Sequence, residues 1–250
     1  MTKLKTALIT GASSGIGEGI VRVLCEAGLT VHALARRAEK LSALAKETEC
    51  KAHAADVTDQ DAMAGVLDVV RPEILVLNAG RGAGFDGIAN SSPKDISSTV
   101  ATNVEATLML LHLALPGMIE RGRGHIVTMG SVAALYPSPS ALYGGTKAAV
   151  KQIAENLRLE LCGTGIRVTD IRPGRVTSEF YDTAVDDPDK AAAAKNTGIR
   201  ELSPIDIGNA VRFAVMAPPH VNVSTIEVQP LEQTYGGLKI DPVAAISGNS

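Results

Sequence analysis

The sequence has few of the residues that mark metal sites, disulfide frameworks or polyanion-binding surfaces. Its three cysteines, Cys25, Cys50 and Cys162, are odd in number, far apart and without metal-ligand spacing, so we expect buried thiols. The five histidines are also dispersed, and no metal site is expected. A net charge of -3 leaves no basic excess for nucleic acid or an acidic membrane surface. Small molecules are the expected partners.

The sequence also lacks a long apolar run. Residues 1–5 lead directly into strand-like sequence, without the apolar stretch and small-residue cleavage site of a signal peptide. The most apolar region, 108–115, is interrupted by His112 and ends at Pro116, so we expect it to be too short to span a bilayer. We therefore expect a cytoplasmic protein without a membrane segment.

Length and composition indicate one folded domain over residues 1–250. Of the 250 residues 45% are hydrophobic, and there is neither a low-complexity tract nor a linker rich in proline or serine. A chain of this size can bury a large core.

Strand-like and helix-like segments alternate along the chain. Short apolar runs of the kind found in buried parallel strands lie at 6–10, 30–35, 51–55, 74–77, 125–129 and 165–171, and a more alternating one lies at 222–229. Amphipathic segments typical of helices lie after the first strand up to residue 28, and at 38–47, 60–70, 93–120, 141–161 and 203–217. This alternation predicts an α/β fold with a parallel, doubly wound sheet that binds ligands at the carboxyl ends of its strands.

Two segments stand outside this alternation. Residues 177–200 are polar and alanine-rich with few apolar anchors, which is typical of a mobile lid over a substrate. The C-terminal tail at 230–250 has no pattern that predicts an element.

A glycine-rich turn lies between the first strand and the first helix. Gly11, Gly15 and Gly17 fall within it. A residue without a Cβ lets the backbone approach a pyrophosphate closely, and the N–H groups of a helix N-terminus point at its charge. The place of the turn, after a strand and before a helix, makes this pattern indicate a dinucleotide site.

Two arginines at the end of the second strand bear on the choice of nucleotide. In a dinucleotide-binding unit an acidic residue there accepts from the 2′-hydroxyl of NAD, whereas an arginine suits the 2′-phosphate of NADP. Arg36 and Arg37 stand at this position, so the sequence favours NADP(H). The alternative is that they are solvated residues at the start of the next helix.

Tyr143 and Lys147 suggest a proton-transfer site. They are four residues apart, so a helix over 141–161 puts them on one face. A free phenol has a pKa of about 10, and a nearby ammonium would stabilise its anion. Ser131, at the end of the preceding strand, could hydrogen-bond the same substrate oxygen that Tyr143 protonates or deprotonates. Tyr-x-x-x-Lys alone also occurs by chance in many helices.

Asn103 lies between apolar stretches of the helix predicted at 93–120. A buried amide is costly there unless it is hydrogen-bonded. Either Asn103 holds the helix to a neighbouring strand or it belongs to a water or proton path past Lys147.

Taken together, these residues resemble the short-chain dehydrogenase/reductase family over nearly the whole chain. The matching motifs, in the family's order and spacing, are Thr10-Gly11-Ala12-Ser13-Ser14-Gly15-Ile16-Gly17, Asp56, Asn78-Ala79-Gly80, Asn103, Ser131, Tyr143-x-x-x-Lys147 and Pro173-Gly174. The resemblance implies a Rossmann-type fold with a seven-stranded parallel sheet and helices on both faces, in which residues 1–90 form most of the dinucleotide-binding half. It also implies reversible hydride transfer between a nicotinamide cofactor and an alcohol or carbonyl.

The resemblance assigns four catalytic roles. Tyr143 is the acid/base, and Ser131 orients the substrate oxygen. Lys147 binds the nicotinamide ribose and lowers the pKa of Tyr143, and Asn103 holds a proton-relay water. Because the family commonly forms tetramers through the helices that begin near residues 93 and 141, a homo-oligomer is expected.

The implied cofactor contacts come from both halves of the chain. They are Gly11, Ser13, Ser14, Ile16 and Gly17 at the phosphates or adenosine; Asp56 and Val57 at the adenine; Asn78, Ala79, Gly80, Tyr143 and Lys147 at the nicotinamide ribose side; and Pro173, Gly174, Val176 and Ser178 near the carboxamide.

Within the family, the C-terminal third is most similar to NADP-dependent dehydrogenases of serine and other small 3-hydroxy acids, and to relatives that reduce sulfoacetaldehyde. The similarity lies at 165–171, 219–227 and 233–238, although Arg172 stands where those enzymes commonly have Glu. The substrate that the resemblance implies is a small alcohol, aldehyde or ketone that bears an acidic group. Arg175 and Arg81 follow the two motifs that bracket the nicotinamide, so each either binds an anionic substrate group or is a surface arginine.

Two alternatives stay open. The protein could reduce another carbonyl class, such as a 3-oxoacyl thioester, a sugar or an aromatic ketone. From another class of function, it could be an NADP-binding sensor without turnover, although an intact Ser131, Tyr143 and Lys147 set counts against that.

Overall fold

The seven strands of the described residues form one parallel sheet. The computed structural model describes residues 4–185, 187–234 and 240–241. The strand order is β3-β2-β1-β4-β5-β6-β7, and every neighbouring pair is parallel. The strands are β1 Thr6–Thr10, β2 Thr30–Ala35, β3 Lys51–Ala54, β4 Ile74–Leu77, β5 Gly124–Met129, β6 Ile166–Pro173 and β7 Thr225–Val228. The predicted doubly wound fold is therefore confirmed.

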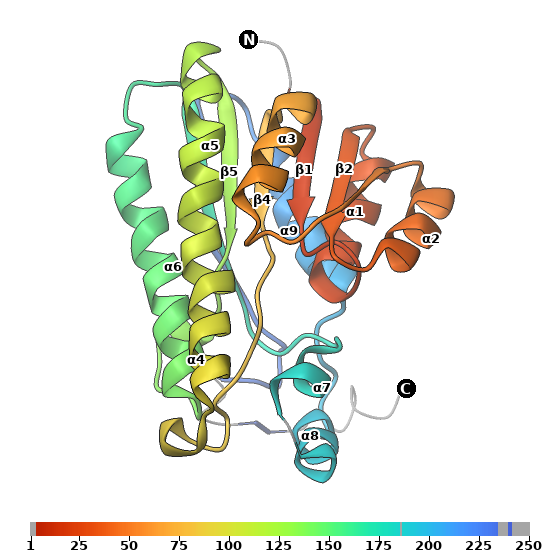
Figure 1. The fold of residues 1–250 in the computed structure, drawn as a ribbon, viewed down its shortest axis with the longest axis vertical. Helices are drawn as coiled ribbons and strands as arrows, with labels where there is room; N and C mark the ends of the chain where they lie inside the picture. The colour runs from red at the N-terminus through yellow and green to blue at the C-terminus, as the bar shows by residue number, and fades with distance from the viewer. Residues whose placement is uncertain (1–3, 186, 235–239, 242–250) are drawn as a thin grey trace.

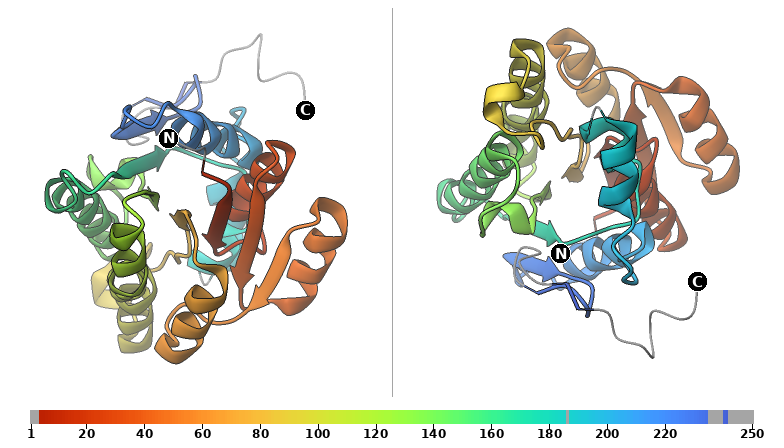
Figure 2. Two further views of the ribbon diagram at one scale, coloured as in Figure 1. Left: turned by 90° about the horizontal axis from the view of Figure 1, so that it is seen from above. Right: turned by 90° about the horizontal axis from the view of Figure 1, so that it is seen from below.

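Helices cover both faces of the sheet (Figures 1 and 2). One apolar core joins the sheet to α1 (Gly15–Glu26), α2 (Ala38–Thr48) and α9 (Pro204–Met216). The other joins it to α3 (Gln60–Val70), α5 (Ala106–Glu120) and α6 (Ala141–Glu160). The central strands β4 and β5 are buried along their whole length, because both of their faces are covered, whereas the edge strands β3 and β7 have no fully buried residue.

The helix predicted at 93–120 consists of three parts. α4 (Pro93–Val100) continues through a π-helical segment, η2 (Ala101–Glu105), into α5. By length and composition this run of 28 residues could cross a membrane, which corrects the shorter span expected from the sequence. Its residues Leu110, Leu111 and Met118 are instead packed in the core against the sheet, and a core helix passes the same test. The π-helical segment marks the turn that carries Asn103.

The segment after β6 crosses the carboxyl ends of the strands, as the view from below in Figure 2 shows. It contains two short helices, α7 (Phe180–Ala184) and α8 (Pro188–Lys195), within the segment expected from its composition to be a mobile lid. Its mobility stays a prediction. β6 extends two residues beyond the predicted end, to Pro173, because Arg172 and Pro173 pair with β7.

The tail returns to the same edge of the sheet. Gln233 forms an isolated antiparallel bridge with Ile240, and its side-chain oxygen accepts from the Arg175 backbone N–H at 2.8 Å. The residues at 235–238 that carry part of the family resemblance lie outside the described residues.

Candidate active site

Ser131, Tyr143 and Lys147 come together where β5 ends and α6 begins. Ser131 follows β5 and caps a short 3-10 helix, η3 (Val132–Ala134), through a bond from the Ala133 N–H at 3.1 Å. Ser140 caps α6 by accepting from the Tyr143 N–H at 2.9 Å. The Lys147 Nζ lies 5.8 Å from the centroid of the Tyr143 ring. The predicted spacing therefore does place the amine beside the phenol.

Burial dominates the protonation of this cluster. It raises the pKa of Tyr143 to about 12, while a hydrogen bond with Ser131 acts in the opposite direction. Burial also lowers the pKa of Lys147 to about 8, against the attraction of Asp170. Burial therefore raises the net pKa of Tyr143 above its usual value in this structure, and the tuning role expected of Lys147 stays a prediction. The ammonium donates to the Met129 carbonyl at 2.7 Å, and the ring is covered by other aromatic side chains.

A buried ion pair lies beneath Lys147. The Asp170 carboxylate accepts from the Thr128 hydroxyl at 2.8 Å and from the Arg172 Nε at 2.6 Å. Arg172 also reaches Glu155 of α6 at 3.2 Å. Asp170 and Arg172 are 1% and 7% exposed, so they form a buried ion pair. Arg172, which stands where the similar enzymes commonly have Glu, therefore balances the negative charge of the carboxylate that raises the pKa of Lys147.

Asn103 uses its side chain to join the loop after β4 to α6. Its Oδ1 accepts from the Arg81 N–H at 2.9 Å, and its Nδ2 donates to the Arg81 carbonyl at 3.0 Å and to the Thr146 hydroxyl at 2.9 Å. A Cβ on Gly80 would lie 3.3 Å from that Oδ1 and 3.8 Å from the Lys147 Nζ. These contacts match the structural alternative for Asn103, and the proton-path role stays a prediction.

The glycine-rich turn has the form that a phosphate needs. Gly11 has φ +66°, and a Cβ on Gly17 would overlap the Gly11 carbonyl oxygen. Asn78 donates to the Thr10 carbonyl at 2.9 Å, which fixes the turn against the end of β4. The Ser14 side chain does not cap α1, so the first N–H groups of this helix are free of a side-chain partner. This chain thus fits a phosphate-bearing nucleotide here.

The remaining predicted cofactor residues surround this turn. Ile16 packs against one core, Val57 lies in the other, and Ala79 donates its N–H to Thr10 at 3.0 Å. The loop after β6 reaches the turn, because a Cβ on Gly15 would lie 3.1 Å from the Ser178 Cβ. Val176 pairs with Leu202, Pro173 ends β6, and Gly174 follows it beside Gln233.

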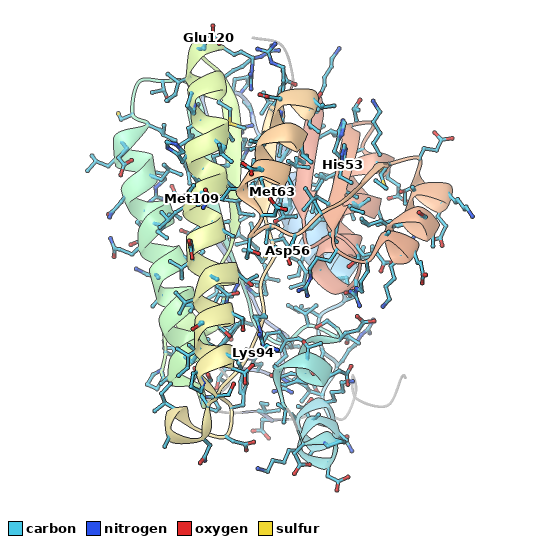
Figure 3. The ribbon with its side chains drawn as sticks, in the orientation of Figure 1. His53, Asp56, Met63, Lys94, Met109 and Glu120 are labelled. Carbon is cyan, nitrogen blue, oxygen red and sulfur yellow. The ribbon has the colours of Figure 1, made fainter. Side chains whose placement is uncertain are left out.

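The two arginines at the end of β2 differ. Arg37 donates to Ser13 at 3.0 Å, to Ser14 at 2.5 Å and to Glu179 at 2.8 Å. Arg36 is exposed and lies 3.7 Å from Asp56, which Figure 3 places below His53, toward the carboxyl end of the sheet. Arg37 is therefore the arginine that the structure directs at the glycine-rich turn.

Both arginines predicted near the substrate are paired with acidic residues. Arg81 donates to Asp95 at 2.9 Å and to Ser98. Arg175 donates to Glu201 at 2.9 Å and to the Ala194 carbonyl, and its guanidinium lies 4.9 Å from the centroid of the Tyr181 ring. Of the two, Arg175 is the one that packs on the aromatic residues around Tyr143.

The aromatic cluster around Tyr143 was not predicted from the sequence. Phe85, from the loop after β4, and Phe180, from α7, lie with ring centroids 5.9 and 5.1 Å from that of Tyr143. Tyr181 extends the cluster at 5.3 Å from Phe180. Aromatic residues are only 3% of the chain, so their position just after the two motifs that bracket the nicotinamide was the available signal. They form the apolar wall over Tyr143.

A cavity of about 710 Å³ lies on the nucleotide side of the site. The glycine-rich turn, α1, α2 and the segment after β6 line it, and Ser13, Ser14, Lys40 and Glu179 are among its residues. It does not include Tyr143, which the aromatic wall covers. Within the described ranges, no group of three or more His, Cys, Asp or Glu side chains is suited to hold a metal ion.

Comparisons with known proteins agree with this geometry. A family model described as short chain dehydrogenase matches residues 5–189. The NADP-dependent 3-hydroxy acid dehydrogenase YdfG of Escherichia coli (strain K12) is 37% identical over 242 residues, which is 93% of this chain and 98% of that protein. Serine 3-dehydrogenase of Rhizobium radiobacter is 36% identical over 243 residues, 94% and 97% of the two chains. The closed form of a serine dehydrogenase complexed with NADP+ has a TM-score of 0.87 at 36% identity, covering 94% of this chain and 98% of that one. The chain therefore belongs to the short chain dehydrogenase family, as its motifs indicated.

Proposed function

We propose that this protein is an NADP-dependent oxidoreductase that transfers a hydride between the nicotinamide and a small alcohol or carbonyl. The observation that carries the proposal is the cluster of Ser131, Tyr143 and Lys147 at the carboxyl edge of the sheet that also holds the glycine-rich turn. The substrate class we propose is a serine-like or other small 3-hydroxy acid or its carbonyl, as in the names of its relatives.

The nucleotide end of the site supports NADP(H) as the coenzyme. The α1 N-terminus and the glycine-rich turn would hold the pyrophosphate, and Arg37 with Lys40 would hold the 2′-phosphate. Asn78 and Gly80 would face the nicotinamide ribose, together with Lys147.

The bound nicotinamide would supply or accept the hydride, and the chain's own residues would manage the proton. In reduction, Tyr143 gives its phenolic proton to the carbonyl oxygen while Ser131 hydrogen-bonds the same oxygen. With a pKa of about 12, Tyr143 is fully protonated at neutral pH and serves as a proton donor. Lys147 then stabilises the phenolate that remains, and in oxidation the same proton returns to Tyr143.

The wall over Tyr143 bears on the substrate. Arg175 supports an acidic substrate group, because its guanidinium stacks on Tyr181 at the edge of that wall, although Glu201 now holds it. Arg81 is the weaker candidate for this role, since its guanidinium is bonded to Asp95 and Ser98 of α4. A second candidate, an aromatic or apolar ketone, is favoured by the rings of Phe85 and Phe180 beside Tyr143.

We propose a cytoplasmic homotetramer that contacts through α4, α5 and α6. Exposed apolar residues on these helices support the interface: Val100, Leu108, Ile119 and Leu159 are 42, 47, 47 and 80% exposed. Sedimentation of the purified protein tests the assembly.

The test of function is a screen of NADPH oxidation by the purified protein against small aldehydes, keto acids and aromatic ketones, with Tyr143→Phe alongside. We expect oxidation with an acidic substrate and a fall of about 10²- to 10⁴-fold in kcat for the variant, because the proton donor is removed. Activity that survives this substitution would contradict the mechanism. Arg175→Met should raise KM for an acidic substrate and spare a neutral one, and equal effects on both would remove Arg175 from the proposal.

A further inference from the structure

The carboxylate of Glu179 lies on two cations at the nucleotide end of the site. The Arg37 Nη1 donates to its Oε2 at 2.8 Å, and the Lys40 Nζ donates to its Oε1 at 2.5 Å. The bonds from Lys40 and Arg37 lower the pKa of Glu179 to about 2, so it is an anion at neutral pH. Glu179 comes from the segment after β6, 139 residues beyond Lys40. The Glu179 carboxylate thus occupies the two side chains, Arg37 and Lys40, that are proposed to bind the 2′-phosphate.

The next residue in the chain reaches the other half of the site. The Phe180 ring lies against that of Tyr143, with centroids 5.1 Å apart. It also packs on the loop after β4, where a Cβ on Gly82 would lie 2.5 Å from the Phe180 Cζ. Glu179 and Phe180 are adjacent at the start of α7. Glu179 contacts the cations Arg37 and Lys40, and Phe180 contacts the proton donor Tyr143.

We propose that Glu179 limits the affinity for NADP(H), and with it the preference over NAD(H), by competing with the 2′-phosphate for Arg37 and Lys40. Phosphate binding then releases the segment that carries Phe180 from α2, so the coenzyme with the 2′-phosphate also loosens the cover over Tyr143. This inference rests on the proposed function, because it takes NADP(H) as the coenzyme.

The charges and exposure of these groups favour such an exchange. The side chains of Arg37, Lys40 and Glu179 are 46, 45 and 45% exposed, and water screens ion pairs of this kind, so they hold weakly. A phosphate monoester carries roughly 1.5 to 2 negative charges at neutral pH and three acceptor oxygens, against one charge and two oxygens for the carboxylate. The phosphate is thus the stronger ligand of the pair. A nucleotide without the 2′-phosphate has no anionic group that could replace the Glu179 carboxylate on Arg37 and Lys40.

Titration calorimetry of NADPH and NADH on the full-length protein tests the competition. In Glu179→Gln we expect the Kd for NADPH to fall roughly five- to thirtyfold, the range that one or two lost pairings span, while the Kd for NADH stays within about twofold. The matched control is Asp182→Asn. Asp182 lies on the same helix and pairs with Lys195, so this variant removes one negative charge without touching Arg37 or Lys40.

The outcomes separate this inference from the function on which it rests. A wild type that binds NADPH no more tightly than NADH would overturn both. A wild type that prefers NADPH, together with an unchanged or weaker NADPH affinity in Glu179→Gln, would overturn the competition alone. So would an equal gain in Asp182→Asn, because the effect would then come from net charge.

A second measurement follows the segment itself. Since the chain has no tryptophan, Thr183→Trp places a single tryptophan on α7, and its emission can be excited separately from that of the tyrosines. Adenosine 2′,5′-bisphosphate should shift its emission and ADP should not, and Glu179→Gln should show the shifted emission without any nucleotide. The same shift with both nucleotides, or a shift with neither, would contradict the release of the segment.

Discussion

Arg172→Met should destabilise the protein by about 3–5 kcal/mol, the usual cost of leaving one partner of a buried ion pair uncompensated. Its Nε lies 2.6 Å from Asp170, and the two side chains are 9% and 2% exposed. Among the described residues, the Thr128 hydroxyl at 2.8 Å is the side-chain hydrogen-bond donor that would then remain on the carboxylate. At this chain length the loss corresponds to a fall in Tm of about 6–20 °C. Urea unfolding followed by circular dichroism measures the free energy, and a thermal melt measures Tm.

The same variant should act on Lys147. Asp170 raises the pKa of Lys147 against the effect of burial, and without Arg172 its negative charge is less balanced. The pKa of Lys147 should therefore rise above about 8, which the pH profile of kcat would register.

A double variant and a control variant test whether the buried ion pair causes the loss of stability. Asp170→Asn/Arg172→Met should recover most of the stability, because no buried carboxylate is left unpaired. Lys151→Met breaks the half-exposed pair with Glu155 and should cost less than about 1 kcal/mol. If Arg172→Met costs no more than Lys151→Met, the buried pair does not have the role assigned to it.

Two further predictions concern the lysine and the nucleotide. Burial holds the pKa of Lys147 at about 8 in the folded protein, against 10.5 in the unfolded chain. Between these two pH values the unfolded state binds more protons than the folded state. The free energy of unfolding should therefore rise with pH over this range, by at most about 3 kcal/mol from this group. Unfolding at pH 8 and pH 10 should show that rise in wild type beyond Lys147→Met, and parallel curves would contradict it. Arg37→Ala should weaken NADPH binding by about 10- to 100-fold through lost charge-assisted bonds, whereas the exposed Arg36→Ala should change it little, as calorimetry would show. Equal losses of NADPH affinity in the two variants would contradict the assignment of the 2′-phosphate to Arg37 rather than Arg36.

Much of the fold and the centre of the site follow from local sequence. Apolar runs such as β4 and β5 predict buried parallel strands because both of their faces are covered. The glycine-rich turn and the four-residue spacing of Tyr143 and Lys147 are also local patterns, and both come together at one edge of the sheet. Parallel topology brings carboxyl ends to the same edge, which is why separate motifs could be joined into one site.

The parts that were missed depend on long-range contacts. Glu179 meets Arg37 across 142 residues, and nothing near either residue in the sequence indicates the pairing. Phe85 and Phe180 likewise meet over Tyr143 only after the chain has folded. The π-helical turn at Asn103 is also hidden, because the apolar periodicity of 93–120 reads as one continuous helix. The net rise in the pKa of Tyr143 was missed for the same reason, since it depends on burial by the segment after β6.

That shift connects the cover over the site with its chemistry. The rings over Tyr143 exclude water, which strengthens the electrostatic interactions that hydride transfer requires, but the same exclusion raises the cost of the phenolate. Only a nearby cation reconciles the two demands, and Lys147 is that cation below its own lowered pKa of about 8. A change that uncovers Tyr143 should thus lower its pKa and raise that of Lys147 together. The segment that begins at Glu179 therefore affects proton transfer as well as access, because it provides the ring that buries the proton donor.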